Sequence, residues 1–439
     1  MKLVIFTPAV KTSAIGRMSC LVTHALVSEG HEVTVVRTEN ESCLDKATHN
    51  FKTELIVWND FRRINGLAAK ADATIYQIGD NYTFHRGCME WLPKLPGVIC
   101  LHDFYLGHLF SEWALTRRQQ ADAELRAWYG VDVANRFFNY QDGDKFIEGT
   151  RETSPMTEWV CSMATGVVTH SNWAIDRVLK SCPGPVYVVP LPYDAPQTKS
   201  SNLEANSSDG DQFRILTVGH ANTNKRIASV IQAIGKSPML RLRSIYRLVG
   251  FIQPETATAL ADLATQNGIK LEISGEIDDD ALNLAYQEAD VISCLRWPSL
   301  ESASASAIEA MLYGKPTIVT DIGFYREIPD SFVMKVDPGR EVQCLQTILE
   351  NLCENNELRR LLGARAQTWA RSTFSPENYA RSLIEICKSS NSAKPAVDAV
   401  IYFSALLRNW GARGNLVDLK DTVEPLHIFE SDITKQPPM

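Results

Sequence analysis

The stretch Glu301-Ser-Ala-Ser-Ala-Ser-Ala-Ile-Glu309 places two carboxylates on either side of small and hydroxyl-bearing residues. A β-branched run at 291–295 precedes it, and apolar residues at helical spacing follow it up to Gly314. This pattern predicts a strand, a loop that carries Glu301, and a helix that contains Glu309. Small residues at a helix start let a diphosphate reach unpaired backbone N–H groups, and carboxylates accept hydrogen bonds from sugar hydroxyls. The stretch therefore predicts a site for a nucleotide sugar.

A structural interpretation of the same stretch is also open, in which both glutamates face water and the serines only start a helix. A second element favours the binding site. After the strand-like run 214–218 and Gly219, the chain places Lys225 and Arg226 at the start of a helical pattern. Two cations at that end oppose the helix macrodipole, whereas they suit a bound pyrophosphate.

Together these elements resemble the nucleotide-sugar half of the retaining glycosyltransferases of family 4, which have the GT-B fold. The resemblance extends over nearly the whole chain. Similar segments are Leu3-Val-Ile-Phe-Thr-Pro8, Ser13-Ala-Ile-Gly16, Gly30-His-Glu-Val-Thr-Val-Val36, Tyr76-Gln-Ile-Gly-Asp-Asn81 with His85, Gly97-Val-Ile-Cys-Leu-His-Asp-Phe104, Thr169-His-Ser-Asn-Trp-Ala174 and Thr320-Asp-Ile-Gly-Phe-Tyr-Arg-Glu327. The last resembles a loop of bacterial polysaccharide enzymes. The resemblance implies an α/β protein with two Rossmann-like parallel-sheet domains that face each other across a cleft.

Short β-branched runs that alternate with amphipathic patterns also predict parallel α/β sheets. A polar stretch at 194–212 interrupts this alternation. We expect an acceptor domain over 1–193, a linker over 194–212 and a nucleotide-sugar domain over 213–375. The resemblance implies that the segment 376–439 crosses back onto the first domain, and residues 400–410 are apolar enough to pack there.

Composition limits the class of protein. The 439 residues have 45% hydrophobic content, which is ample for two cores, and the net charge of -8 argues against nucleic acid as a partner. Ten cysteines without a Cys-x-x-Cys pair predict reduced core residues of a cytoplasmic protein. We expect no signal peptide and no membrane span. Aromatic and basic residues mix at 113–118 and 125–129, which suits either peripheral contact with a membrane or an ordinary amphipathic helix.

Ligands of parallel sheets bind beyond the carboxyl ends of the strands, where each of these motifs lies. The resemblance assigns Lys225 and Arg226 to the pyrophosphate, Glu301 to sugar hydroxyls, Glu309 to the ribose and the loop 274–277 to the base. The expected donor-binding residues are Gly16, Gly219, Lys225, Arg226, Ile277, Glu301, Ser302 and Glu309. The chain departs from the family at His220, where a second cation is common.

His102 ends an apolar strand and matches a histidine that the family places in its active site. Asp103 follows it and either orients His102 or contacts the acceptor. We therefore predict the catalytic residues His102, Asp103 and Glu301, with His85 and His170 as lesser candidates.

The resemblance implies hexose transfer with retention from a nucleotide sugar to a glycan or lipid-linked acceptor, in bacterial surface polysaccharide synthesis, without a metal or other cofactor. The leaving phosphate itself receives the acceptor's proton. Two alternatives are a non-hydrolysing nucleotide-sugar epimerase and a degenerate partner subunit of a polysaccharide complex. A dinucleotide oxidoreductase is disfavoured because no Gly-x-Gly-x-x-Gly follows a strand.

Overall fold

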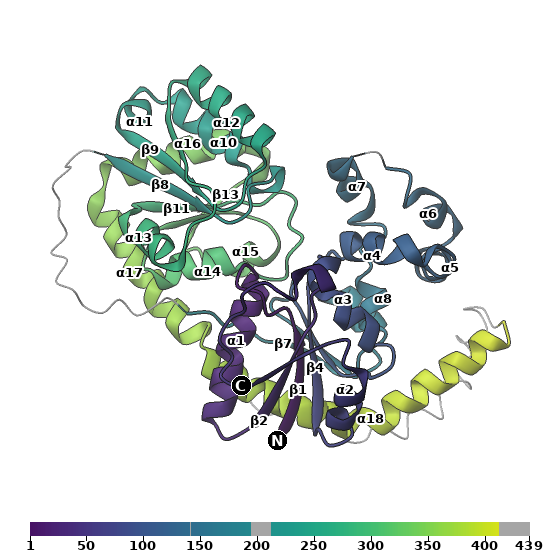
Figure 1. Ribbon diagram of the computed structural model, residues 1–439. Coiled ribbons are helices and arrows are strands. Elements are labelled where there is room, and N and C mark those ends of the chain that lie inside the picture. Colours follow the sequence, from purple (N-terminus) through teal and green to yellow (C-terminus); the bar gives the residue numbers. More distant parts are fainter. Residues whose placement is uncertain (141, 195–211, 412–439) are drawn as a thin grey trace.

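The computed structural model describes residues 1–140, 142–194 and 212–411. Two parallel sheets, each covered by helices, form two domains that lie one above the other in Figure 1. The N-terminal sheet has seven strands in the order β3-β2-β1-β4-β5-β6-β7. These strands are β1 (Lys2–Thr7), β2 (Glu32–Arg37), β3 (Glu54–Val57), β4 (Ala73–Ile78), β5 (Val98–Leu101), β6 (Gly166–Thr169) and β7 (Val186–Val188).

The C-terminal sheet has six strands in the order β10-β9-β8-β11-β12-β13. They are β8 (Phe213–Val218), β9 (Ser244–Val249), β10 (Lys270–Ile273), β11 (Val291–Cys294), β12 (Thr317–Thr320) and β13 (Met334–Val336). The β-branched runs of the central strands are buried almost throughout, because helices cover both faces of a parallel sheet.

The helices follow the strands in alternation. In the N-terminal domain they are α1 (Ala14–Ser28), α2 (Phe61–Ala68), α3 (Tyr82–Trp91), α4 (Gly107–Trp113), α5 (Arg118–Tyr129), α6 (Val131–Arg136), α7 (Gly143–Thr150), α8 (Thr157–Cys161) and α9 (Ile175–Ser181). In the C-terminal domain they are α10 (Ile227–Lys236), α11 (Pro238–Arg243), α12 (Pro254–Asn267), α13 (Asp279–Glu288), α14 (Ala305–Leu312), α15 (Gly323–Glu327), α16 (Glu341–Glu354) and α17 (Asn356–Thr373). Short 3-10 turns are η1 (Glu41–Cys43), η2 (Ala114–Thr116), η3 (Thr223–Lys225) and η4 (Pro338–Arg340).

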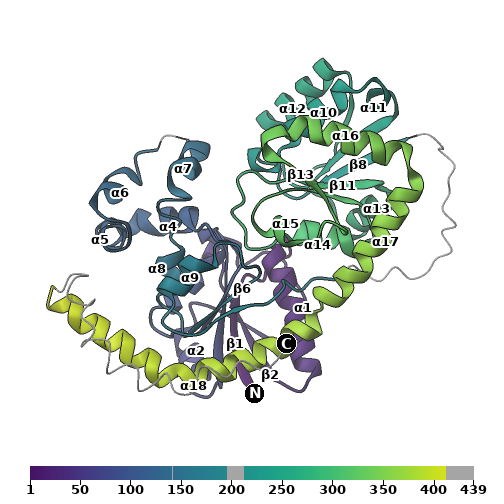
Figure 2. The same ribbon diagram turned by 180° about the vertical axis from the view of Figure 1, so that it is seen from behind.

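The last helix, α18 (Pro376–Asn409), leaves the C-terminal domain and runs beneath the N-terminal sheet, as Figure 2 shows from behind. Its Ser390 donates to the backbone oxygen of Thr165 at 2.9 Å, and Asn391 donates to that of Asp72 at 2.7 Å. The segment 376–409 thus packs on the first domain before its end projects away. At that end Tyr402 and Trp410 are exposed, so the expected packing of residues 400–410 is wrong.

The polar stretch predicted as a linker lies between the two sheets in the chain, and its residues 195–211 are outside the described ranges, as is the tail after Asn415. The domain limits themselves stay a prediction. No helix within the described ranges is long and apolar enough to cross a membrane.

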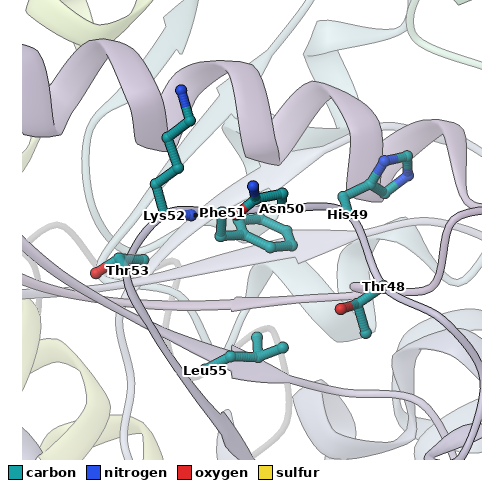
Figure 3. A pocket seen from close by; sticks show the side chains of 7 residues that line it. All are labelled: Thr48, His49, Asn50, Phe51, Lys52, Thr53 and Leu55. Carbon is teal, nitrogen blue, oxygen red and sulfur yellow. Dashed lines mark hydrogen bonds between the residues drawn. The ribbon is translucent and has the colours of Figure 1, made fainter.

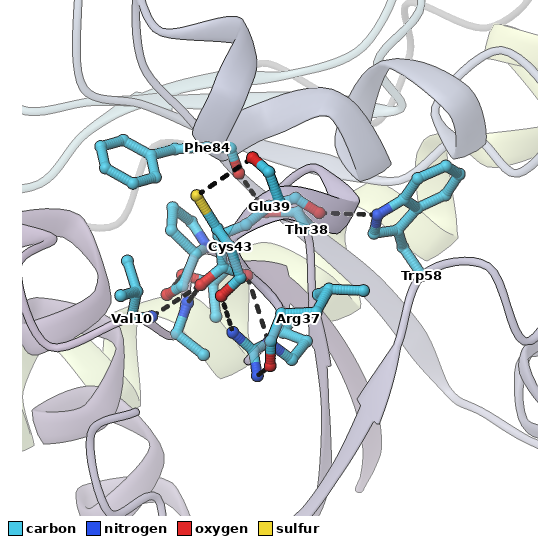
Figure 4. A network of polar contacts seen from close by, with 12 residues as sticks. Val10, Arg37, Thr38, Glu39, Cys43, Trp58 and Phe84 are labelled. Carbon is cyan, nitrogen blue, oxygen red and sulfur yellow. Dashed lines mark hydrogen bonds and ion pairs between the residues drawn. The ribbon is translucent and has the colours of Figure 1, made fainter. Parts of the chain in front are cut away.

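A buried carboxylate shapes the loop between β1 and α1 (Figure 4). Glu39, with no exposed surface, accepts hydrogen bonds from the backbone N–H groups of Ala9 and Val10 at 2.7 and 2.6 Å. Arg37 lies 3.5 Å from the same carboxylate. A buried charge with two N–H donors and a cation is compensated, so it can hold the loop that leads into α1 in one conformation.

Candidate functional site

Glu301 lies in the loop between β11 and α14, where the sequence predicts it. Ser304 caps α14, because its side chain accepts from the N–H of Ala307. The carboxylate of Glu301 accepts a hydrogen bond from the hydroxyl of Tyr325 and lies 3.2 Å from Nε of Arg296. These two contacts fix the direction of the carboxylate.

Lys225 is buried at the end of η3, and its ammonium donates to the backbone oxygen of Val218. Burial and the positive charge of Arg296 lower the pKa of Lys225 to about 7, although Glu301 opposes this shift. Gly219 leaves space for the Lys225 ammonium, because a Cβ added at Gly219 would lie 2.8 Å from Nζ of Lys225. The φ angle of Gly219, +98°, also favours glycine at this position. Lys225, Arg296 and Glu301 therefore form one cluster at the carboxyl ends of β8 and β11.

Arg226 lies outside this cluster, and its predicted role beside Lys225 on a pyrophosphate stays a prediction. Its backbone is left-handed, with φ at +57°, and its guanidinium forms an ion pair with buried Glu341 at 2.9 Å. Arg296 takes the place beside Lys225 instead. Sequence reasoning missed Arg296, although its position directly after the β11 run, at a strand end, was a usable signal.

Glu309 is buried within α14 and contacts the opposite domain. Its Oε1 accepts from Arg17 of α1 at 2.7 Å, and its Oε2 accepts from the hydroxyl of Tyr286 at 3.0 Å. Burial raises the pKa of the Glu309 carboxyl, although Arg17 and Tyr286 act in the other direction. A water-facing Glu309, the structural interpretation of this residue, is wrong.

Gly16 lies in the first turn of α1, one residue before Arg17. A Cβ at Gly16 would lie 2.7 Å from the backbone oxygen of Pro8, so packing against the β1 loop already requires a glycine there. In the C-terminal domain, Ile277 is half-buried and packs against the core, in a loop where Gly250 N–H donates to the oxygen of Gly275. His220 is exposed, and its ring meets Phe251 edge-on with centroids 5.1 Å apart.

Backbone hydrogen bonds join the two domains at the site. Asp103 and Glu301 form an antiparallel bridge, in which Phe104 N–H donates to the oxygen of Leu300 and Ser302 N–H donates to that of His102, each at 2.8 Å. The hydroxyl of Ser302 donates to the oxygen of Leu101 at 2.7 Å. The hydroxyl of Ser302 is thus engaged by the N-terminal domain, while Glu301 and Asp103 are brought side by side from different domains.

His102 is buried, and its Nε2 lies 2.7 Å from Oε1 of Gln77. Burial, with His170 and His85 nearby, holds the pKa of His102 well below its usual range, so the ring is neutral at pH 7. The His102 and His170 rings lie 4.9 Å apart. Gln77 thus contacts one ring nitrogen of His102, and both roles left open for Asp103 stay predictions.

Asp103 accepts from the N–H of Asp80 at 2.8 Å. Burial, and the nearby carboxylates of Asp80 and Glu301, raise the pKa of Asp103 to about 7. Asp80 itself lies 2.6 Å from Nδ1 of His108 on α4. The N-terminal side of the cleft thus presents one carboxyl group that changes its charge near neutral pH.

A cavity of about 560 Å³ lies along the single segment 48–55 (Figure 3). None of the predicted site residues lines it. Among the described residues there is also no group of three or more His, Cys, Asp or Glu side chains that could hold a metal ion.

Comparisons with known proteins agree with this architecture. Residues 199–369 match the family model described as glycosyl transferases group 1. No curated protein matches the chain. Among solved structures, HepE from Anabaena, in complex with UDP and glucose, is 17% identical with a TM-score of 0.57, over 89% of this chain and 100% of that one.

Two further structures are similar. Sucrose-phosphate synthase from Thermosynechococcus elongatus is 14% identical with a TM-score of 0.62, over 90% of this chain and 100% of that one. WaaG, a glycosyltransferase involved in lipopolysaccharide biosynthesis, is 18% identical with a TM-score of 0.57, over 87% of this chain and 98% of that one. These likenesses confirm the predicted two-domain GT-B fold.

Proposed function

We propose that this chain is a glycosyltransferase that moves a hexose from a nucleotide-diphosphate sugar to a hydroxyl group of a glycan or glycolipid, with retention at the anomeric carbon. Residues 199–369 match the glycosyl transferases group 1 model and the chain has the GT-B fold, and both support the proposal. The cluster of Lys225, Arg296 and Glu301 beside the bridge to Asp103 carries the proposal. Two cations suit a diphosphate, and a fixed carboxylate suits sugar hydroxyls.

In this proposal Lys225 and Arg296 stabilise the negative charge that grows on the diphosphate as the sugar leaves. Both are already buried beside each other, so little reorganisation is needed when the charge develops. The leaving phosphate takes the acceptor's proton, and no metal takes part. Glu301, held by Arg296 and Tyr325, accepts from a hydroxyl of the transferred hexose.

Asp103 binds the acceptor hydroxyl, and His102 lines the N-terminal wall as a neutral ring. Gly16 and Gly219 give room near the phosphates, Ile277 and the loop around it contact the base, and Ser302 supports the helix start.

Glu309 accepts a hydrogen bond from the ribose once the side chain of Arg17 moves away. We leave Arg226 out of the proposed donor set because Glu341 holds it.

The donor to test first is UDP-glucose, because the HepE structures hold UDP, glucose and UDP-glucose. WaaG, through its role in lipopolysaccharide biosynthesis, supports a place for this chain in bacterial surface polysaccharide synthesis. Nucleotide sugars and ten free thiols both suit the cytoplasm, where we place the reaction, with acceptors supplied at the membrane face.

The test combines binding and turnover on the full chain. Titration calorimetry with UDP, GDP and ADP, each with EDTA present, selects the base, and release of nucleotide from the matching sugar donor measures turnover. Glu301→Gln should keep nucleotide affinity within about threefold and reduce turnover by about 10²-fold or more, as for loss of a transition-state contact. The control Glu354→Gln changes an exposed carboxylate of α16 and should leave both unchanged.

Each outcome decides between the candidates. Chelator-insensitive binding with turnover that Glu301→Gln removes supports the transferase. Binding without any turnover favours the degenerate partner subunit, and release of a sugar epimerised at a ring carbon favours the epimerase. No nucleotide binding by the unchanged chain overturns the proposal.

A further inference from the structure

A cavity of about 310 Å³ opens next to the bridge between Asp103 and Glu301. Phe104, which follows Asp103, and Leu300, which precedes Glu301, both line it. The cavity therefore begins one residue from the two carboxylates on which the proposed transfer depends. Its size is at the lower end for ligand pockets, which suits a single sugar ring better than an extended glycan.

The apolar part of the lining is aromatic. Trp173 is half-buried, and its ring meets that of buried Phe104 edge-on, with centroids 5.0 Å apart. From the C-terminal side Gly323 lies beside this ring, because a Cβ added at Gly323 would reach van der Waals contact with Cε2 of Trp173, at 3.4 Å. A rigid indole face offers an apolar surface on which the C–H face of a pyranose can pack.

The backbone beside Trp173 is held in an unusual conformation. Ala174, which also lines the cavity, has φ at +61°, in the left-handed region that side-chain-bearing residues rarely adopt. It directly precedes α9 and so fixes where the chain turns from Trp173 into that helix. Such strain persists where the surrounding structure enforces it, and it concentrates at binding sites.

The polar part of the lining is balanced in charge. Glu152 and Asp176 are exposed carboxylates, and Arg151 and Arg177 are the two cations. Arg177 is held by Glu158 at 2.7 Å, and the Arg151 guanidinium lies 5.9 Å from the ring centroid of Trp297. Carboxylates accept and guanidiniums donate, so together they match hydroxyl groups, which do both.

We propose that this cavity is the acceptor subsite and that it binds an uncharged pyranose, stacked on Trp173 with its hydroxyls on Asp176, Glu152 and Arg151. This inference rests on the proposed glycosyl transfer and adds the class of acceptor. The balanced lining gives no net attraction for a phosphorylated or uronic acid unit.

The test is saturation-transfer NMR on the full-length protein with its nucleotide bound. The probes are the methyl glycosides of glucose, mannose and galactose, with glucuronic acid and glucose 6-phosphate as the charged set. Trp173→Ala and Asp176→Asn are compared with Trp410→Ala, which removes an exposed tryptophan that follows α18 and does not line the cavity. Nucleotide affinity is measured by calorimetry in every variant.

We expect at least one neutral glycoside to receive saturation in the unchanged protein and in Trp410→Ala. The signal should fall at least fivefold in Trp173→Ala and in Asp176→Asn, while the nucleotide Kd stays within twofold. If no neutral glycoside binds, if the charged sugars bind better, or if neither cavity variant reduces the signal, the acceptor subsite is overturned. Absence of nucleotide binding in the unchanged protein would instead overturn the transferase proposal itself.

Discussion

The guanidinium of Arg17, on the first helix of the N-terminal domain, lies 2.7 Å from the carboxylate of Glu309, on the first helix after the Glu301 loop in the other domain. Asp194 and the ring of Tyr193, 4.6 Å from the guanidinium, complete its surroundings. The residue proposed for the ribose is therefore tied to the opposite domain. In the proposed function, Arg17 shares or leaves Glu309 when a donor binds, which would couple donor binding to the contact between the domains.

Arg17→Ala should destabilise the protein by about 3 kcal/mol, because it leaves the Glu309 carboxylate buried without its cation. Chemical denaturation of the unchanged protein and the variant measures this difference. The double variant Arg17→Ala with Glu309→Gln should recover part of the loss, since no uncompensated charge remains. A matched exposed arginine, changed in Arg126→Ala, should leave the midpoint unchanged. Equal midpoints for Arg17→Ala and Arg126→Ala would contradict the ion pair.

Lys225→Met should weaken UDP binding by about 10- to 100-fold near pH 6.5, the effect of removing a charged hydrogen bond. In the unchanged protein, affinity should fall as the pH rises above about 7, because Lys225 then loses the proton that a diphosphate requires. The Met variant should lack this fall. Calorimetry from pH 6 to 9 provides the measurement, and Lys236→Met, at the exposed last residue of α10, is the control. Identical pH profiles in both proteins would remove Lys225 from the site.

Arg226→Gly should keep turnover per folded molecule within about threefold, in contrast to the sequence-based expectation for this cation. Glycine accepts the left-handed backbone at this position without strain, whereas alanine would not. Loss of the Arg226 partner should still lower stability, since the Glu341 carboxylate is buried. Nucleotide release and thermal unfolding separate the two effects. A fall in turnover that matches Glu301→Gln would return Arg226 to the catalytic cluster.

Asp103→Asn should change how stability depends on pH. The pKa of Asp103 in the folded protein, at about 7, lies above the pKa of an aspartate in the unfolded chain. The protonated form of Asp103 therefore contributes stability in full below about pH 4, and this contribution is lost as the pH rises through about 7. Relative to Asp103→Asn, the unchanged protein should therefore lose melting temperature between pH 4 and 7. Asp45→Asn, at an exposed position, should follow the unchanged protein. Parallel curves for all three proteins would contradict the raised pKa.

Most of the fold follows from local pattern. The β-branched runs predicted as strands, 214–218 and 291–295 among them, are strands in the structure, and the match of residues 199–369 to the glycosyl transferases group 1 model agrees with the predicted class. Two strands escaped prediction, Glu54–Val57 and Met334–Val336, which are short and lie at sheet edges. An edge strand is only partly buried, so its sequence lacks a continuous apolar run. The opposite error concerns residues 400–410, which were expected to pack because they are apolar. Their aromatic residues are exposed, because an apolar segment is buried only where another surface of the protein covers it.

By itself the sequence determined which strand ends to examine for a site, because alternation of strand and helix places His102 directly after a buried run, and Lys225 and Glu301 in the loops that follow two others. Only the tertiary structure decided which neighbours of these residues share their site. Adjacent residues point in different directions once the backbone turns, so Lys225 enters the cluster while Arg226 turns to Glu341. Packing of the sheet brings Arg296 to Glu301, and packing of the two domains brings Arg17 to Glu309. Such contacts between distant segments of the chain do not alter the hydrophobic periodicity of either segment, so the sequence pattern does not predict them.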